Sequence, residues 1–231
     1  MSTLVLLPGM DGTGELFGAF ARALPPSLRI HVTRFPCTEA MGYEELLQHT
    51  LAELSQYEDV YLLGESFSGP LSILITETLG ERVRGLILCC TFVRSPLESL
   101  VQFRTLINFA PFGLVPAWAV SPLLFGRWST PQLREQLGSS LRQVAPSVLR
   151  KRVSEIALVD VSEALARTRA PILHLQATAD ALVGRSASGR IAALRPDAEA
   201  VRIDGAHCLL QTNPSECARA VARFIEGVEN A

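Results

Sequence analysis

The chain has 231 residues, of which 48% are hydrophobic and 19% are charged, so it can bury a substantial core. Its formal net charge of -2 at pH 7 and its single lysine, Lys151, provide no basic pattern for binding a phosphate backbone, so we expect no nucleic acid partner. The five cysteines are odd in number and form no CxxC pair, so we expect neither a disulfide framework nor a metal site.

Short apolar segments alternate with longer segments that repeat apolar residues at helical spacing. This alternation predicts repeated βα units, in which a mostly parallel sheet has helices on both faces. The predicted strands are residues 4–7, 28–33, 60–63, 86–90, 172–176 and 200–203. The predicted helices are residues 16–24, 43–54, 69–79, 187–194 and 215–228. We expect a single α/β domain that covers residues 1–231.

The first predicted strand runs into the glycine-rich sequence LPGMDGTG of residues 7–14. A glycine-rich loop after a first strand is also typical of dinucleotide-binding domains, but the order here is GxxGxG and not GxGxxG. The second predicted strand ends in TRFP (residues 33–36), without the acidic residue that would bind a ribose. Because Arg34 could meet a 2′-phosphate, NADP binding stays open at this point.

The third predicted strand is followed at once by the sequence GESFSG of residues 64–69. It resembles the GxSxG nucleophile elbow, a sharp strand-to-helix turn that exposes a serine hydroxyl. Ser66 is therefore the predicted nucleophile, and Gly64 meets the need for a small residue where strand and helix pass closely. The fifth position is Ser68 where the pattern prefers glycine, although Gly69 follows directly.

The regular alternation stops between about residues 93 and 169, where proline-interrupted helical segments replace it. We expect these residues to form a helical cap inserted into the domain. Aromatic residues of this cap can line an apolar pocket over Ser66, although packing is their commoner role: Phe103, Phe109, Phe112, Trp118, Phe125 and Trp128.

Residues 105–126 carry no charge and could be mistaken for a membrane span. Pro111, Pro116 and Pro122 divide them into segments too short to cross a bilayer as one helix, so we expect no stable membrane insertion. An apolar flap or a surface that touches lipid fits better. The first residues run from an apolar tetrad into Pro8 and lack a secretory pattern, so we expect a cytoplasmic protein.

A serine hydroxyl needs a base to take its proton and an acid to orient that base. In enzymes with this elbow the acid and then the histidine follow the serine in the chain. His31 and His49 precede Ser66, and His174 lies inside a predicted strand. His207 follows the last predicted strand in a loop, where such folds place their chemistry, so it is the predicted base.

Eleven carboxylates lie between the serine and His207, and Asp180 alone closes a predicted strand. Asp180 is therefore the predicted orienting acid. A turn or helix-capping role is its alternative, and Asp160 is the other candidate acid.

Attack on an ester builds negative charge on the carbonyl oxygen, which two backbone N–H groups typically stabilise. The N–H of Phe67 is one predicted donor, because it stands at the start of the helix after the elbow. The N–H of Met10, in the glycine-rich loop, is the other.

These features together are similar to the α/β-hydrolase superfamily, and the resemblance covers residues 4–224. Residues 7–14 also resemble the start of small bacterial esterases such as pimeloyl-carrier-protein methyl esterases, and of the plastid phytyl ester synthase group. The resemblance implies the α/β-hydrolase fold. Two departures are Pro8, where a histidine often braces the oxyanion loop, and the absence of an amino-terminal hairpin, which implies a six-stranded core.

The triad predicts a serine esterase that cleaves a carboxylic ester with an apolar acyl or alcohol part through an acyl-enzyme, and that needs no metal or organic cofactor. An acyltransferase or thioesterase with the same triad is the first alternative. A small-molecule receptor on the same fold is the second, since fold does not determine function. A nucleotide-binding role would not explain why Ser66, Asp180 and His207 occur in the order and places of a catalytic triad.

Overall fold

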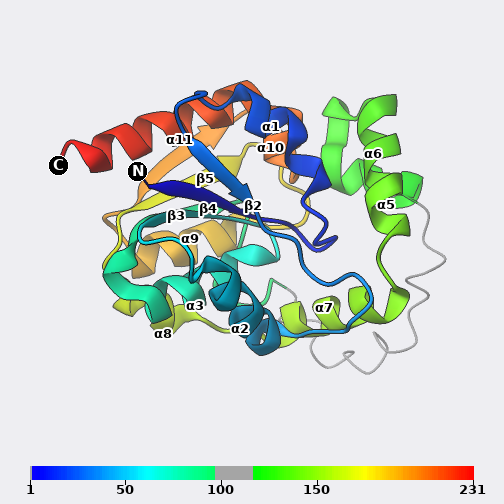
Figure 1. Cartoon of the computed structure of the whole chain (residues 1–231). Coiled ribbons are helices and arrows are strands. Elements are labelled where there is room, and N and C mark those ends of the chain that lie inside the picture. The colour runs from blue at the N-terminus through cyan, green and yellow to red at the C-terminus, as the bar shows by residue number, and fades with distance from the viewer. Residues whose placement is uncertain (1, 97–116) are drawn as a thin grey trace.

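The computed structural model describes residues 2–96 and 117–231. It contains a six-stranded sheet, most of whose strands are labelled in Figure 1. Its strand order is β2-β1-β3-β4-β5-β6, and every neighbouring pair is parallel. The strands are β1 (Thr3–Leu7), β2 (Arg29–Val32), β3 (Val60–Glu65), β4 (Val83–Cys89), β5 (Ile172–Ala177) and β6 (Glu199–Ile203). The predicted six-stranded, mostly parallel sheet is confirmed.

The central strands are apolar along their whole length because both of their faces are covered. Every residue of β1 and β3 is buried, whereas the edge strands β2 and β6 are partly exposed. A strand covered on both faces needs a continuous apolar run, and this run is what made the central strands predictable from the sequence.

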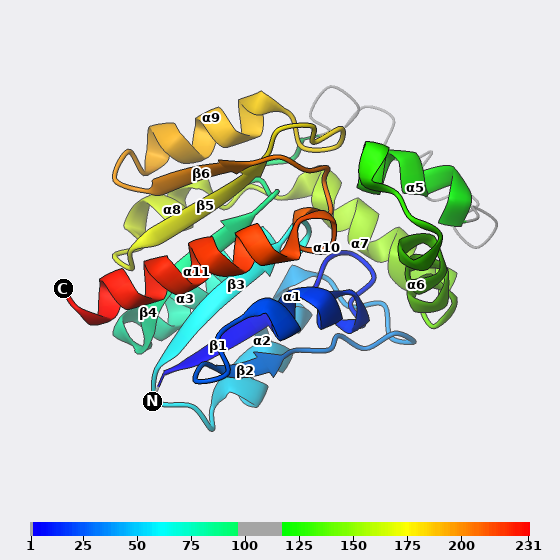
Figure 2. The same cartoon turned by 90° about the horizontal axis from the view of Figure 1, so that it is seen from above.

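Helices cover both faces of the sheet, as predicted. On one face lie α1 (Gly18–Ala23), α10 (Leu209–Thr212) and α11 (Pro214–Glu229), and on the other lie α2 (Tyr43–Leu54), α3 (Ser68–Leu79), α8 (Ser162–Arg167) and α9 (Arg185–Leu194) (Figures 1 and 2). Phe20, Val221 and Phe224 belong to the first core layer, and Leu46, Leu71 and Ile191 to the second.

The ends of several elements differ by one to three residues from the prediction, and two helical segments differ in kind. The helix predicted at 16–24 is divided into the 3-10 turn η1 (Glu15–Phe17) and α1. Gly14 has a left-handed conformation, and its carbonyl accepts from the N–H of Phe17, three residues on, which is the hydrogen bond of a 3-10 turn. The short helix α10 between His207 and the last helix was not predicted. Four residues are too few for a helical period to be recognised in a sequence.

From Ala117 onward, the segment between β4 and β5 is mostly helical. It contains α5 (Ala117–Phe125), the turn η4 (Gly126–Trp128), α6 (Pro131–Arg142), α7 (Pro146–Leu158) and α8. We call α5, α6 and α7 the cap helices, since they lie beside the sheet near the loop after β1 (Figures 1 and 2). Across residues 2–96 and 117–231, no helix combines the length and apolar character that crossing a bilayer requires.

Candidate active site

Ser66 stands at the turn between β3 and α3 in the conformation expected of a nucleophile elbow. Its φ of 51° is in the left-handed region, which is unusual for a residue with a side chain. Its N–H donates to the carbonyl of Cys89 (3.0 Å), and its own carbonyl accepts from the N–H of Gly69 (3.1 Å) and from the hydroxyl of Thr91. The end of β4 therefore holds the strained turn in place.

The small residues around the elbow are required by close contacts. A Cβ on Gly64 would lie 2.5 Å from Ser72 Oγ and 2.6 Å from the carbonyl oxygen of Ser68. A Cβ on Gly69 would overlap the side chain of Thr91. Gly69 is thus the residue that must be small where the helix passes close to Thr91. The elbow pattern usually has its second glycine one position earlier, and Ser68 occupies that position here.

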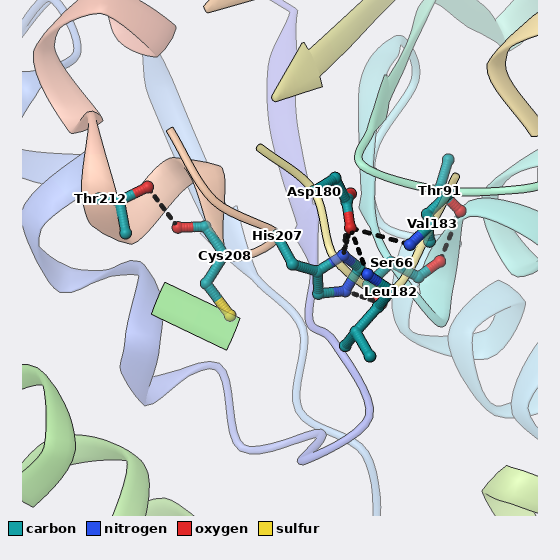
Figure 3. A network of polar contacts seen from close by, with 8 residues as sticks. All are labelled: Ser66, Thr91, Asp180, Leu182, Val183, His207, Cys208 and Thr212. Atoms are coloured by element: carbon teal, nitrogen blue, oxygen red, sulfur yellow. Dashed lines mark hydrogen bonds and ion pairs between the residues drawn. The ribbon is translucent and has the colours of Figure 1, made fainter. Parts of the chain in front are cut away.

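The structure brings the three predicted triad residues together. Ser66 Oγ lies 2.8 Å from His207 Nε2, and His207 Nδ1 lies 3.0 Å from both carboxylate oxygens of Asp180 (Figure 3). Since an ionised carboxylate only accepts hydrogen bonds, Nδ1–H of the neutral imidazole donates to Asp180 and Nε2 is left to accept the proton of Ser66. This is the arrangement that a serine needs for activation.

Asp180 is held as an anion. Burial by itself raises the pKa of its carboxyl, but the hydrogen bond and charge of His207, with the N–H groups of Val183 and Leu182, outweigh burial and lower the pKa overall. The two N–H groups donate to Asp180 Oδ1 at 2.8 and 2.9 Å. The turn role proposed as the alternative for Asp180 therefore occurs together with the contact to His207.

The other candidate residues lie elsewhere. Asp160 pairs with Arg94 (3.4 Å) and accepts from the N–H of Ser162, and neither contact involves His207. His174 is 2% exposed in β5, where burial lowers the pKa of its imidazole to about 4, so it is neutral at pH 7. His31 contacts Glu53.

A cavity of about 210 Å³ opens at Ser66 and His207. Its walls are mostly apolar and come from the sheet loops and from all three cap helices: Met10, Leu16, Phe92, Leu124, Leu137 and Ile156. The carbonyl of Leu124 on α5 accepts from the N–H of Cys208 (2.9 Å), so a cap helix is bonded to the loop that carries His207. Such a cavity suits an apolar group attached to a reacting carbonyl.

The two predicted oxyanion donors belong to residues beside this cavity. Met10 lines it, and Phe67 directly follows Ser66 as the N-terminal cap of α3. The Phe67 ring stacks on Tyr43 with centroids 4.8 Å apart, and Tyr43 Oη donates to the carbonyl of Phe67 (2.9 Å). Burial, with a smaller effect of Glu155, raises the pKa of Tyr43, which keeps its hydroxyl protonated as a donor.

The predicted aromatic lining differs from what the structure contains. Phe103, Phe109 and Phe112 lie outside the described residues. Trp118 is 72% exposed, Phe125 is fully buried, and Trp128 lies against the guanidinium of Arg127, so none of these three lines the cavity. Leu124 lines it in their place, because successive residues of a helix point about 100° apart and Phe125 consequently faces away.

Glu65, which precedes Ser66, was missed by the sequence reasoning although it also lines the cavity. It is 5% exposed, and burial, followed by the nearby charge of Asp11, raises the pKa of its carboxyl to about 8. Gln211 Nε2 donates to its Oε2 (3.3 Å). Its position at the C-terminal end of β3, directly before Ser66, was the available signal, because sites of parallel sheets lie at the carboxyl ends of the strands.

Within the part of the chain that the structure describes, no three histidine, cysteine, aspartate or glutamate side chains gather closely enough to hold a metal ion.

Comparison with known proteins places this geometry in a family. Residues 4–220 match the model of the alpha/beta hydrolase family. The chain is 26% identical to a pimeloyl-[acyl-carrier protein] methyl ester esterase of Xanthomonas oryzae pv. oryzae, an alignment that covers 97% of this chain and 95% of that protein. Over 114 residues, 46% of this chain but only 16% of the relative, it is 30% identical to phytyl ester synthase 1, chloroplastic, of Arabidopsis thaliana.

A solved esterase of Thermogutta terrifontis superposes with a TM-score of 0.85 at 18% identity, covering 99% of this chain and 90% of that one. At this identity the similarity shows a shared fold only, and that fold is the one expected from the family match. The chain is a member of the alpha/beta hydrolase family.

Proposed function

We propose that this protein is a serine esterase in which Ser66 attacks the carbonyl of a carboxylic ester. The observation that carries the proposal is the continuous contact from Ser66 Oγ to His207 Nε2 and from His207 Nδ1 to Asp180, at the opening of an apolar cavity. Membership of a hydrolase family and the similarity to an esterase along almost the whole chain support the same activity.

The acylation half-reaction follows from this geometry. As Ser66 Oγ bonds to the carbonyl carbon, its proton passes to His207 Nε2, and Asp180 stabilises the imidazolium through Nδ1. The N–H groups of Met10 and Phe67 hold the negative oxygen that forms. When the bond to the alkoxy oxygen breaks, His207 returns the proton to the departing alcohol, and the acyl group remains on Ser66.

Deacylation repeats these steps with water. His207 takes a proton from water as its oxygen attacks the acyl carbon, and it then returns a proton to Ser66 Oγ while the carboxylic acid leaves. The apolar walls from Met10, Phe92 and Leu124 favour an apolar acyl or alcohol part.

A fluorophosphonate probe tests the proposal directly. We expect the wild-type protein to be labelled at Ser66 and to hydrolyse short p-nitrophenyl esters, while Ser66→Ala does neither. Ser55→Ala is the control, because Ser55 is an exposed serine at the end of α2 and should leave both signals unchanged. Hydrolysis by Ser66→Ala at the wild-type rate would rule out an esterase that uses Ser66 as its nucleophile. Absence of labelling in the wild type would favour a non-catalytic receptor on this fold.

Acyl transfer is the second candidate, favoured by the similarity to phytyl ester synthase 1 over 46% of the chain. It uses the same acyl-enzyme, which an alcohol resolves in place of water. Adding a long-chain alcohol during turnover should divert the acyl group into a new ester if this candidate is right, and a carboxylic acid as the sole product would exclude it. Thioester substrates compared in the same assay distinguish a thioesterase.

A further inference from the structure

Arg152, on the cap helix α7, is a fully buried cation whose partners are backbone carbonyls. Its Nη1 donates to the carbonyls of Met10 (2.8 Å) and Asp11 (2.9 Å), and its Nη2 donates to the carbonyl of Pro36 (3.0 Å). The guanidinium also lies 5.6 Å from the centre of the Phe35 ring. One side chain therefore joins the cap to the loops after β1 and β2.

The loop after β1 is shaped to receive this guanidinium. The N–H of Gly12 donates to the carbonyl of Gly9 (3.0 Å), which closes a turn with Met10 and Asp11 as its central residues. Gly12 has a φ of 74°, and a Cβ there would lie 2.5 Å from Arg152 Nη1. Glycine at this position both permits the turn and leaves room for the arginine.

A second cap helix is bonded to the same turn. The carboxylate of Asp11 accepts from the N–H of Thr13 (3.0 Å), from the Thr13 hydroxyl, and from Ser140 Oγ on α6 (2.7 Å). Asp11 and Ser140 are both buried. Two cap helices thus reach the turn through buried hydrogen bonds, one to its carbonyls and one to its only charged side chain.

We propose that Arg152 is a positioning residue that holds the Gly9–Gly12 turn so that the Met10 N–H points at the developing oxyanion. This inference rests on the esterase proposed above. Backbone donors stabilise an oxyanion strongly only when they are already oriented. The Met10 N–H shares its peptide unit with the Gly9 carbonyl, which accepts from the Gly12 N–H, and Arg152 holds the next two peptide units of the turn through the carbonyls of Met10 and Asp11. Arg152 thus braces this loop from the cap helix α7.

An arginine suits this role better than a lysine does. Its planar guanidinium reaches three carbonyls from fixed directions, whereas an ammonium on a flexible chain cannot match all three at once. Its neighbour Lys151 pairs with Glu155 (2.8 Å) near the surface, although both belong to the same basic sequence, RKR. Only the fold separates the buried arginine from the surface charges.

Kinetics of Arg152→Lys and Arg152→Met test the inference against a matched control. Arg195 is also a buried arginine, 8% exposed, and donates to the carbonyls of Thr168 (2.7 Å) and Ala170 (3.1 Å), so Arg195→Lys disturbs a comparable contact away from the cavity. We expect Arg152→Lys to lower kcat by about 10- to 100-fold with KM within about threefold of wild type. Arg195→Lys should keep the wild-type kcat.

A boronic acid inhibitor gives a second readout, because its tetrahedral adduct with Ser66 places an oxygen in the oxyanion position. Its affinity should fall in Arg152→Lys by a factor similar to the loss of kcat, which a purely structural role would not produce. If Arg152→Met does not fold, the test uses Arg152→Lys, whose folding is checked by a circular dichroism spectrum identical to that of the wild type. Wild-type kcat and boronate affinity in a folded Arg152 variant, while Ser66→Ala is inactive, would overturn this inference alone. Hydrolysis by Ser66→Ala would overturn the proposed function itself.

Discussion

The hydroxyl of Ser68 donates a hydrogen bond to the carbonyl of Pro8, and this bond joins the helix after the elbow to the loop after β1. Ser68 stands at the fifth position of the elbow pattern, where glycine is preferred, and its hydroxyl uses this position to reach the glycine-rich loop. Each predicted oxyanion donor is close in the chain to one partner of this bond: Phe67 directly precedes Ser68, and Met10 follows Pro8 by two residues. The bond therefore restrains the distance between the two segments that carry the donors.

Removing this contact should destabilise the protein. Ser68 is fully buried, and Ser68→Ala leaves the buried carbonyl of Pro8 without this donor, which we expect to lower the free energy of unfolding by about 1–3 kcal/mol. Urea unfolding measures the change. Ser55→Ala is the matched control, since Ser55 Oγ also donates to a carbonyl, that of Ala52, but at the exposed end of α2. Equal unfolding midpoints for the two variants would contradict the prediction.

Replacing the orienting acid should abolish most of the activity without unfolding the protein. Asp180→Asn keeps an oxygen for the N–H groups of Leu182 and Val183 but removes the charge that stabilises the His207 imidazolium. We expect kcat for a p-nitrophenyl ester to fall by about three to four orders of magnitude. Asp160→Asn should leave kcat within about twofold of wild type, and the reverse result would assign the acid to Asp160.

The buried carboxyl of Glu65 should make stability depend on pH. Its pKa in the folded protein is about 8, raised from 4.5, so the folded chain retains a proton that the unfolded chain releases. Glu65 therefore contributes fully to stability below about pH 4.5, and this contribution falls by about 1.4 kcal/mol per pH unit as the pH rises toward about 8.

Glu65→Gln removes that titration while keeping the size of the side chain. Relative to wild type, the variant should become progressively more stable between about pH 5 and about pH 8, as measured by urea unfolding across that range. Glu226→Gln, at an exposed position of α11, should follow the wild-type curve. A constant difference between Glu65→Gln and wild type at every pH would show that Glu65 does not carry the proton.

The wall formed by Leu124 should limit the size of the apolar group. Leu124→Ala enlarges the cavity, and each extra methylene that it then buries should raise kcat/KM by about fourfold, equivalent to about 0.8 kcal/mol. A series of p-nitrophenyl esters of increasing chain length measures this preference. Leu123→Ala is the control, because Leu123 is the preceding residue of α5 but is 47% exposed. An unchanged preference in Leu124→Ala would place the apolar group elsewhere.

Much of the scaffold was predictable because it depends on local pattern. Strands covered on both faces must be continuously apolar, and β3 is followed at once by the elbow sequence around Ser66. His207 and Asp180 were found from chain order and from their places after predicted strands, since parallel strands deliver their following loops to the same edge of the sheet. The structure brings His207 to Ser66 and Asp180 to His207.

The cap was not predictable at the level of residues. Its aromatic side chains were the natural candidates, yet Leu124 lines the cavity while Phe125 packs away from it, because the choice depends on how α5 is rotated against its neighbours. Arg152 gave no sequence signal, since a basic triplet in a helix ordinarily faces solvent.

The sequence by itself determined the alternation of strands and helices and the chemical types placed after each strand, because hydrophobic periodicity and turn residues act over a few neighbouring positions. Only the tertiary structure decided which distant groups meet: Ser68 with Pro8, Ser140 with Asp11, and Arg152 with Met10. Burial of a polar side chain is tolerated only where partners are already in place, and those partners belong to segments whose positions depend on the whole fold.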